Sequence, residues 1–140
     1  MNQATIRAIL RTRLQAVPDL PLLVYEGEQT NNANVLRITD EVRLGTSSNL
    51  ASGMTLARPL YFLSIEAPAG LIVREVDRLS NSIALAFEPG RTLTDDNRTH
   101  FLEVTTLDLG THRVLGTGWS FRRCTVGLTA TAFRTILQTA

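Results

Sequence analysis

The sequence predicts an α+β domain, a mostly antiparallel β-sheet with two helices on one face and the element order α-β-β-β-α-β-β. Two segments place apolar residues at helical spacing, and five others alternate or run apolar as strands do. Helices that interrupt a series of strands in this way are expected to cover one face of the sheet. With no internal repeat and no linker-like stretch, residues 1–140 are expected to form one domain.

The first helix is predicted over residues 4–17. Its arginines fall mostly on the opposite side of the helical wheel from its apolar residues. Asn2 or Thr5 is suited to cap its beginning, and Pro18 and Pro21 end it because proline cannot continue the helical backbone. The apolar positions are Ile6, Ile9, Leu10, Leu14 and Val17.

The second helix is predicted within residues 67–90. Its apolar residues recur at the spacing of one helical face, and charged residues occupy the other face. Pro68 suits a first turn, where the missing N–H costs nothing, and Pro89-Gly90 ends the segment. The apolar positions are Ile72, Val76, Leu79, Ile83 and Phe87.

Three strands are predicted before the second helix, over residues 20–28, 35–44 and 58–68. In the second of these, Asp40 falls on the apolar face and is expected to mark a bulge or a strand end. The third carries apolar groups on both faces, Tyr61 and its neighbours on one and Phe62 on the other. It is therefore expected to be central and covered on both sides, by the core or by a neighbouring subunit.

Two strands are predicted after the second helix. A polar loop over residues 91–99 precedes them, and a hairpin turn around residues 109–112 joins segments 100–109 and 112–128. Trp119, Phe121 and Val126 are expected to fill the core. Residues 129–140 fit either a strand extension or a one-turn helix.

Composition excludes several classes of protein. The 140 residues are 44% hydrophobic and 19% charged, with a net charge of +1, so nothing favours a strongly nucleic-acid-binding or anionic-membrane surface. All 14 basic residues are arginine. A single cysteine excludes an intrachain disulfide, and no signal-peptide-like or membrane-spanning stretch is found. Folding and assembly in a reducing cytoplasm are expected.

Catalytic residues are not predicted. His100 and His112 lack clustered ligands at metal-binding spacing, so they are expected to be solvated strand-end residues. The adjacent carboxylates of Asp95 and Asp96 are better explained as a charge-balanced turn than as an acid–base pair. Cys124 is expected to be an inert core residue. We therefore expect no enzyme activity, no metal and no cofactor.

The stretch "LGTSSNLASGMTLA", residues 44–57, is unusually long for a hairpin connection and contains no charge. We interpret it as a long β-hairpin arm that docks on another subunit, because uncharged polar groups cost little to desolvate. The alternative is an unselected flexible loop. The candidate assembly contacts are Ser47, Asn49, Leu50, Met54 and Leu56, together with Arg11 and Arg58.

Several phrases resemble one family. The helix "IRAILRTRL" followed by "PLLVYEGE", the strand "RPLYFLSIEAPAG" running into "LIVREVDRLSNSIALAFEPG", and the late "GWSFRRCTVGL" are similar to the tail terminator (tail completion) proteins of long-tailed bacteriophages. Related proteins occur in phage-like gene-transfer particles. The resemblance covers nearly the whole chain and rests on element order and phrases, without a diagnostic signature residue.

The resemblance implies a structural protein of the virion. Such proteins form a ring, usually a hexamer, that caps the head-proximal end of the tail tube, stops its polymerisation and offers a docking surface to the head–tail connector. The implied partners are further copies of the chain, the tail tube protein and the connector or stopper protein. The implied location is the neck end of the tail, with assembly in the host cytoplasm.

The same resemblance implies no membrane and no sequence-specific nucleic acid, although DNA can pass through such a ring. Two other readings stay open. One is another part of the same machine, a head–tail stopper or a tail tube subunit. The other is a small α+β enzyme or ligand-binding module, which would need a concave pocket with convergent polar groups.

Overall fold

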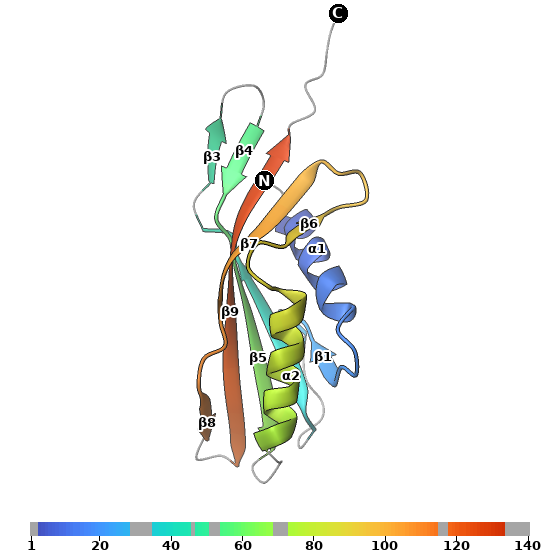
Figure 1. Cartoon of the computed structure of the whole chain (residues 1–140), viewed down its shortest axis with the longest axis vertical. Helices are drawn as coiled ribbons and strands as arrows, with labels where there is room; N and C mark the ends of the chain where they lie inside the picture. The colour runs from blue at the N-terminus through green and yellow to red at the C-terminus, as the bar shows by residue number, and fades with distance from the viewer. Residues whose placement is uncertain are drawn as a thin grey trace, which may run out of the picture.

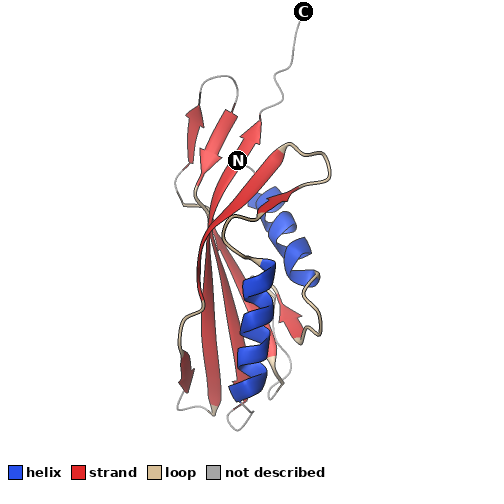
Figure 2. Ribbon diagram, in the orientation of Figure 1, coloured by secondary structure: helices blue, strands red, loops and turns tan. Residues whose placement is uncertain are grey.

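Two helices lie on one face of a curled, mixed but mostly antiparallel sheet, which confirms the predicted fold class (Figures 1 and 2). The structure is a computed structural model that describes residues 3–28, 35–45, 47–50, 54–68, 73–114 and 118–133. The elements are α1 (Gln3–Gln15), β1 (Leu22–Val24), β2 (Arg37–Arg43), β3 (Ser47–Leu50), β4 (Met54–Ala57), β5 (Leu60–Pro68), α2 (Val73–Ala86), β6 (Thr92–Thr94), β7 (His100–Asp108), β8 (His112–Val114) and β9 (Trp119–Phe133).

The longest strand, β9, is the central strand of the sheet, because four other strands pair along its two edges. On one edge, β5 pairs with residues 119–127 and β4 with residues 130–133. On the other edge, β8 pairs with residues 120–122 and β7 with residues 125–132. The outer strands β2, β3 and β6 pair with β5, β4 and β7, and among the described strands only β1 and β2 run parallel.

Two glycines mark points where one strand gains a residue relative to its partner. The pairing shifts by one residue between β2–β5 and β3–β4, and Gly45, in that gap, has φ of 65°. It shifts again between β7–β9 and β8–β9, and Gly110, in that gap, has φ of 64°. Added side chains would meet the carbonyl oxygens of Arg58 and Arg123 respectively. Glycine is needed at both bulges, since it adopts this backbone without steric cost.

Helix α1 is slightly shorter than predicted, because the chain leaves helical geometry before Pro18, but all its predicted apolar residues are buried. Helix α2 occupies only the middle of the predicted segment. Val76, Leu79, Ile83 and Phe87 are buried as predicted, whereas Ile72 lies outside the described residues.

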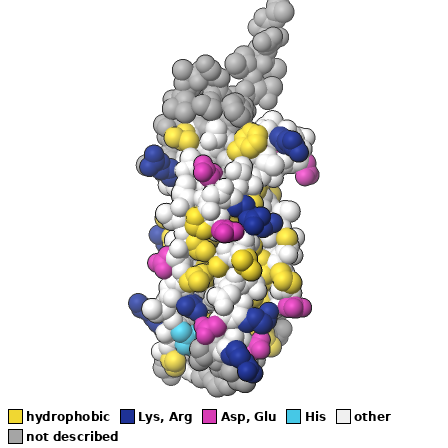
Figure 3. Space-filling view, in the orientation of Figure 1, with side chains coloured by type: hydrophobic (Ala, Val, Ile, Leu, Met, Phe, Trp, Pro, Cys, Tyr) yellow, Lys and Arg dark blue, Asp and Glu magenta, His cyan; other side chains and the backbone are white. Residues whose placement is uncertain are grey.

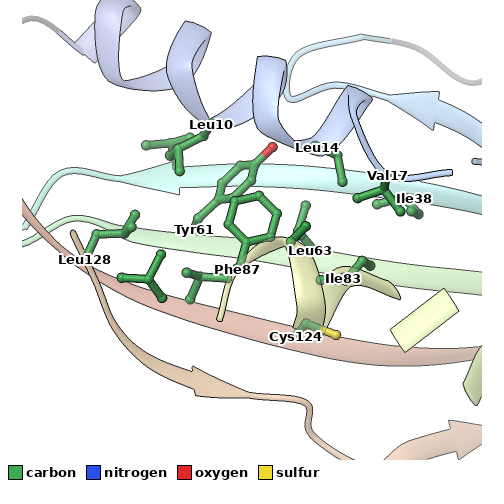
Figure 4. Close-up of a cluster of buried hydrophobic side chains, with 14 of the residues drawn as sticks. Leu10, Leu14, Val17, Ile38, Tyr61, Leu63, Ile83, Phe87, Cys124 and Leu128 are labelled. Carbon is green, nitrogen blue, oxygen red and sulfur yellow. The ribbon is translucent and has the colours of Figure 1, made fainter. Parts of the chain in front are cut away.

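The core lies between the helices and the sheet (Figure 4). Tyr61 of β5 and Phe87, just after α2, are both fully buried and meet edge to face, with ring centroids 5.9 Å apart. Leu10 of α1 and Cys124 of β9 are also fully buried. Alternate residues of β5 and β9 reach this face, so the sheet supplies one side of the core and both helices the other.

Several strand predictions were wrong. Residues 109–112 form no hairpin, because β7 and β8 run on along the same edge of β9 and the bulge at Gly110 separates them. The predicted polar loop contains β6, which pairs with β7. Trp119 and Phe121 are only partly buried and lie on the face of the sheet opposite the helices, since they alternate with Ser120 and Arg122. Val126 is in the core, as predicted.

The interpretation of Asp40 was also wrong. It lies in the middle of β2, in unbroken pairing with Leu63 of β5, and marks neither a bulge nor a strand end. The last predicted segment is a strand extension as far as Phe133, and residues 134–140 lie outside the described residues.

Replacing Leu10 by alanine should destabilise the fold by roughly 2–5 kcal/mol, because the side chain is fully buried and its loss leaves a cavity. The matched control is Leu85→Ala on α2, where the leucine is 69% exposed and little should change. Urea unfolding followed by circular dichroism measures both variants. Equal effects of the two substitutions would contradict the placement of α1 against the sheet.

Gly110→Ala should destabilise the protein more than Gly90→Ala. Both glycines have positive φ, so both alanines carry roughly 1–2 kcal/mol of backbone strain. Only at Gly110 does the new methyl group also meet a backbone carbonyl, whereas nothing lies within 4 Å at Gly90. The melting temperatures of the two variants, measured by thermal denaturation, distinguish backbone strain alone at Gly90 from strain plus a steric clash at Gly110. Identical melting temperatures would argue against the close approach of the β7–β8 connection to Arg123.

Candidate assembly surfaces

The uncharged stretch 44–57 is the outer half of one long hairpin. β2 continues through the Gly45 bulge into β3, and β4 continues into β5 with the same register on β9 (Ala57↔Ala130, Leu60↔Gly127). The β3–β4 strands, here called the arm, extend the sheet beyond both helices (Figure 1). The expected hairpin is therefore present, and its strand β4 pairs with β9.

The structure separates the predicted assembly contacts. Leu56 is half-buried, and it lies on the helix-free face because its neighbour Ala57 is buried in the core. Arg58, at the base of the arm, is exposed. The side chains of Ser47, Asn49, Leu50 and Met54 lie outside the described residues, although their backbones form β3 and β4.

Arg11 was predicted as an assembly contact, but it has a partner inside the chain. Its guanidinium makes a two-pronged ion pair with Asp40, Nε–Oδ2 at 2.8 Å and Nη2–Oδ1 at 3.0 Å. Its Cζ also lies 4.1 Å from the centre of the Tyr25 ring. Arg11 therefore binds α1 to the sheet, and its role as an assembly contact stays a prediction.

The carboxylate of Asp40 is almost fully buried and accepts four hydrogen bonds. Besides Arg11, the hydroxyl of Tyr61 donates to it at 2.8 Å and the backbone N–H of Glu26 at 2.8 Å. Burial raises the pKa of Asp40, but these donors outweigh burial, so its pKa lies below its ordinary value. Burial, together with the Asp40 charge, raises the pKa of Tyr61, which keeps its proton and stays a donor.

The helix-free face of the sheet carries aromatic rings covered by arginines. Phe62 of β5 lies under two guanidiniums, Arg43 at 4.9 Å and Arg123 at 4.2 Å from the ring centre. Both arginines also reach Glu41, at 3.2 Å and 3.1 Å. The cluster therefore spans β2, β5 and β9, with an aromatic centre and alternating charges around it.

A second cluster of the same kind lies toward the other end of this face. Arg37 of β2 stacks over the ring of Trp119 at 4.3 Å and pairs with Glu66 at 2.7 Å. Phe121 is partly buried beside it on β9. Arginine and aromatic side chains are enriched in protein–protein interfaces, whereas lysine is depleted. This composition favours a protein partner for the face over a purely solvated role.

A groove of about 600 Å³ lies between α1 and β6. Its floor contains Ile9 and Leu93, and Asp95 and Asp96 close one end. Slight burial raises the pKa of Asp95, but hydrogen bonds from His100 and Thr99 outweigh it and hold the pKa below its ordinary value. Asp95 thus orders its own turn, while Asp96 is exposed.

The described residues contain no convergent catalytic or metal-binding group. No cluster of three or more metal-ligating side chains is found among them. Burial raises the pKa of Cys124 to about 11, so the thiol stays protonated at neutral pH, as expected of a core cysteine. No described helix has the length and apolar character needed to span a membrane. The described surface visible in Figure 3 shows charges of both signs in alternation.

Comparison with known proteins supports the fold and no more. No protein-family model matches the sequence, and no curated protein matches it. Twenty chains of solved structures match, and one of them has a TM-score of 0.63 and 16% sequence identity, covering 97% of this chain and 99% of that chain. The name of that protein states no activity. Full coverage of both chains agrees with a complete shared architecture, and an identity this low carries nothing about function.

The clusters on the helix-free face were not predicted, although the sequence contains a signal for them. Arg37, Glu41 and Arg43 lie on one face of a predicted strand, and Phe62 lies on the matching face of another. Pairing those strands in register places opposite charges around the ring. The Arg11–Asp40 pair was not predicted either, because α1 and β2 are far apart in the sequence.

Arg11→Ala should destabilise the fold by about 3 kcal/mol, since it leaves a buried carboxylate without its cation. Arg7→Ala is the matched control: Arg7 also lies on α1 and pairs with Glu26 at 3.2 Å, but both side chains are about one-third exposed, so its loss should cost under about 1 kcal/mol. Chemical denaturation at neutral pH compares them. An Arg11 variant as stable as the Arg7 variant would count against the central role of Asp40.

The stability of the protein should also fall in acid. A carboxylate whose folded pKa is depressed adds stability above its unfolded pKa of about 3.8, and this stability is lost as pH falls through the folded value. Unfolding free energies measured from about pH 5 to pH 2 should therefore decline, and Asp40→Asn should flatten part of that decline. An Asp40→Asn curve parallel to the wild-type curve would refute this assignment.

Proposed function

We propose that the protein is a structural subunit that forms a ring on the head-proximal end of a phage-type tail tube, ending tube growth and offering a surface to the head–tail connector. The observation that carries the proposal is the arm. It is uncharged in sequence, continues the sheet beyond both helices, and leaves the outer edge of β3 without a partner among the described strands.

An unpaired, uncharged edge is a liability for a protein that works alone. It exposes backbone donors and acceptors to any passing strand, and monomeric proteins commonly protect such edges with charges, proline or a covering element. The sequence of β3, "SSNL", has none of these. A partner that covers the edge explains why the chain keeps it.

The helix-free face supports contacts on a second side of the subunit. A subunit in a closed ring must present two different surfaces, because each copy contacts one neighbour with each. The arm and the clusters around Phe62 and Trp119 lie on different parts of the sheet. The sequence resemblance to tail terminator proteins supplies the rest of the proposal: the tail tube and the connector as partners, and the virion neck as location.

A tail tube subunit or a head–tail stopper would use similar surfaces, and assembly distinguishes them. Self-association into long tubes would identify a tube subunit, whereas a terminator should stop at a single ring. A small-molecule function is less well supported, since the groove between α1 and β6 is open and the described residues bring no catalytic groups together in it.

Replacing residues 48–56 by Asn-Gly should abolish capping while leaving the fold intact. The change joins the paired residues Ser47 and Ala57 through a two-residue turn, so the remaining hairpin keeps its register. Particles assembled with this variant should show tails of uncontrolled length or heads without tails. Electron microscopy of negatively stained particles measures tail length and head attachment.

Circular dichroism and thermal denaturation must show that the shortened protein folds. Leu85→Ala is the surface control, because it removes an exposed apolar side chain far from the arm and should give normal particles. Normal tails with the shortened arm would refute a role for the arm. Failure of the intact protein to form rings or to bind tail tubes would refute the proposed function as a whole.

A further inference from the structure

Two short strands have outer edges that no described strand covers. β6 pairs only with β7, and β8 pairs only with β9. They lie on the same side of β9 in the sheet, toward opposite ends of that strand (Figure 1). An edge strand offers unpaired backbone donors and acceptors to another strand. Two such edges, placed head and tail, allow one copy of the chain to pair with the next.

The free edge of β6 faces the groove beside α1. Antiparallel pairs alternate between bonded and non-bonded residues, and the N–H of Val104 donates to the carbonyl of Arg91 at 2.9 Å. By that alternation Thr92 and Thr94 turn their backbone groups outward, into the groove. Its walls contain small side chains of α1 such as Ala8, which leave room for an added strand.

Each edge has one exposed charged residue without an ion pair among the described residues. Arg13, which also lines the groove, donates to the carbonyl of Ala86. Asp96, at one end of the groove, is exposed and makes no ion pair with a described residue. Arg113, in the middle of β8, is likewise exposed and without an ion pair among the described residues. Val114, next to it, is 71% exposed, the largest value among the exposed large apolar side chains of the described chain.

The other free edges fit β8 less well. β1 follows Pro18 and Pro21, and proline offers no backbone donor to a pairing strand. β3 has no charge in or beside it that could select Arg113. The groove beside β6 is the described edge that combines an apolar floor, formed by Ile9 and Leu93, with an unpaired carboxylate.

We propose that β8 of one copy adds to the free edge of β6 in the next copy, with Arg113 paired to Asp96 and Val114 packed in the groove beside α1. The contact is heterologous, because each copy gives its β8 to one neighbour and its β6 to the other. This inference rests on the proposed ring, to which it adds a contact between neighbouring copies beside those of the arm and the helix-free face. Each contact is short, so closure of the ring, which gives every copy two contacts, stabilises the assembly.

Charge reversal tests the pairing. Asp96→Arg and Arg113→Asp should each weaken self-association by roughly tenfold or more, since each sets like charges opposite one another. The double variant restores opposite charges in every contact and should recover association. Native mass spectrometry and sedimentation velocity measure oligomer size across concentration, with the protein alone and bound to tail tubes.

One control accompanies the reversals. Arg74→Asp makes the same change at an exposed arginine of α2, outside both strands, and should associate like the wild type.

Each outcome decides the matter. If both single variants lose self-association and the double variant recovers it, the result supports the contact. Normal rings with either single reversal overturn the contact but leave the proposed ring function standing. Normal rings that no longer bind tail tubes would assign the β6 edge to the tube protein and also overturn the contact. A wild-type chain that forms no ring, free or on tubes, defeats both proposals.

Discussion

The buried carboxylate of Asp40 is the interaction on which the rest of the structure depends. Asp40 belongs to β2 and lies where this strand meets α1, the turn after β1, and β5, and each of these three neighbours gives it a hydrogen-bond donor. A buried charge is tolerated only when its partners are complete. The chain must therefore bring Arg11, Glu26 and Tyr61 together at once, which fixes the position of α1 over one half of the sheet and leaves α2 to cover the other.

That arrangement covers one face of the sheet with helices and leaves the other face without them. With both helices on one face, the rings of Phe62 and Trp119 on the other face lie under arginines of the same sheet. The length of β9 extends the sheet further. On one edge, β9 pairs with β4 of the arm, which lies beyond the helices, and on the other edge it pairs with β7 and β8. The surfaces available for assembly follow from a core that closes on one side alone.

The fold could be predicted from local patterns, and the site only in part. Helical spacing placed Leu10 and Ile83 correctly, and strand alternation placed Tyr61 and Val126 in the core. The features that depend on pairing between distant segments could not be predicted in this way. No residue near Asp40 in the sequence indicates that Arg11 is its partner. A glycine at a bulge, such as Gly110, looks the same in the sequence as a glycine in a turn unless the partner strand is known. The half-buried place of Trp119 was missed for the same reason, because a large aromatic residue in a strand fits either face.

The position of β9 in the chain has a consequence for biosynthesis. Every other described strand and both helices leave the ribosome before β9, yet β9 pairs with four of those strands. Before it emerges, the β2–β5 ribbon and the helices have no common sheet to pack on. Folding therefore depends on contacts between distant parts of the sequence, which form slowly and only after β9 has emerged. The edge of β8 that the proposed contact uses is likewise not in place on the sheet before β9 has emerged.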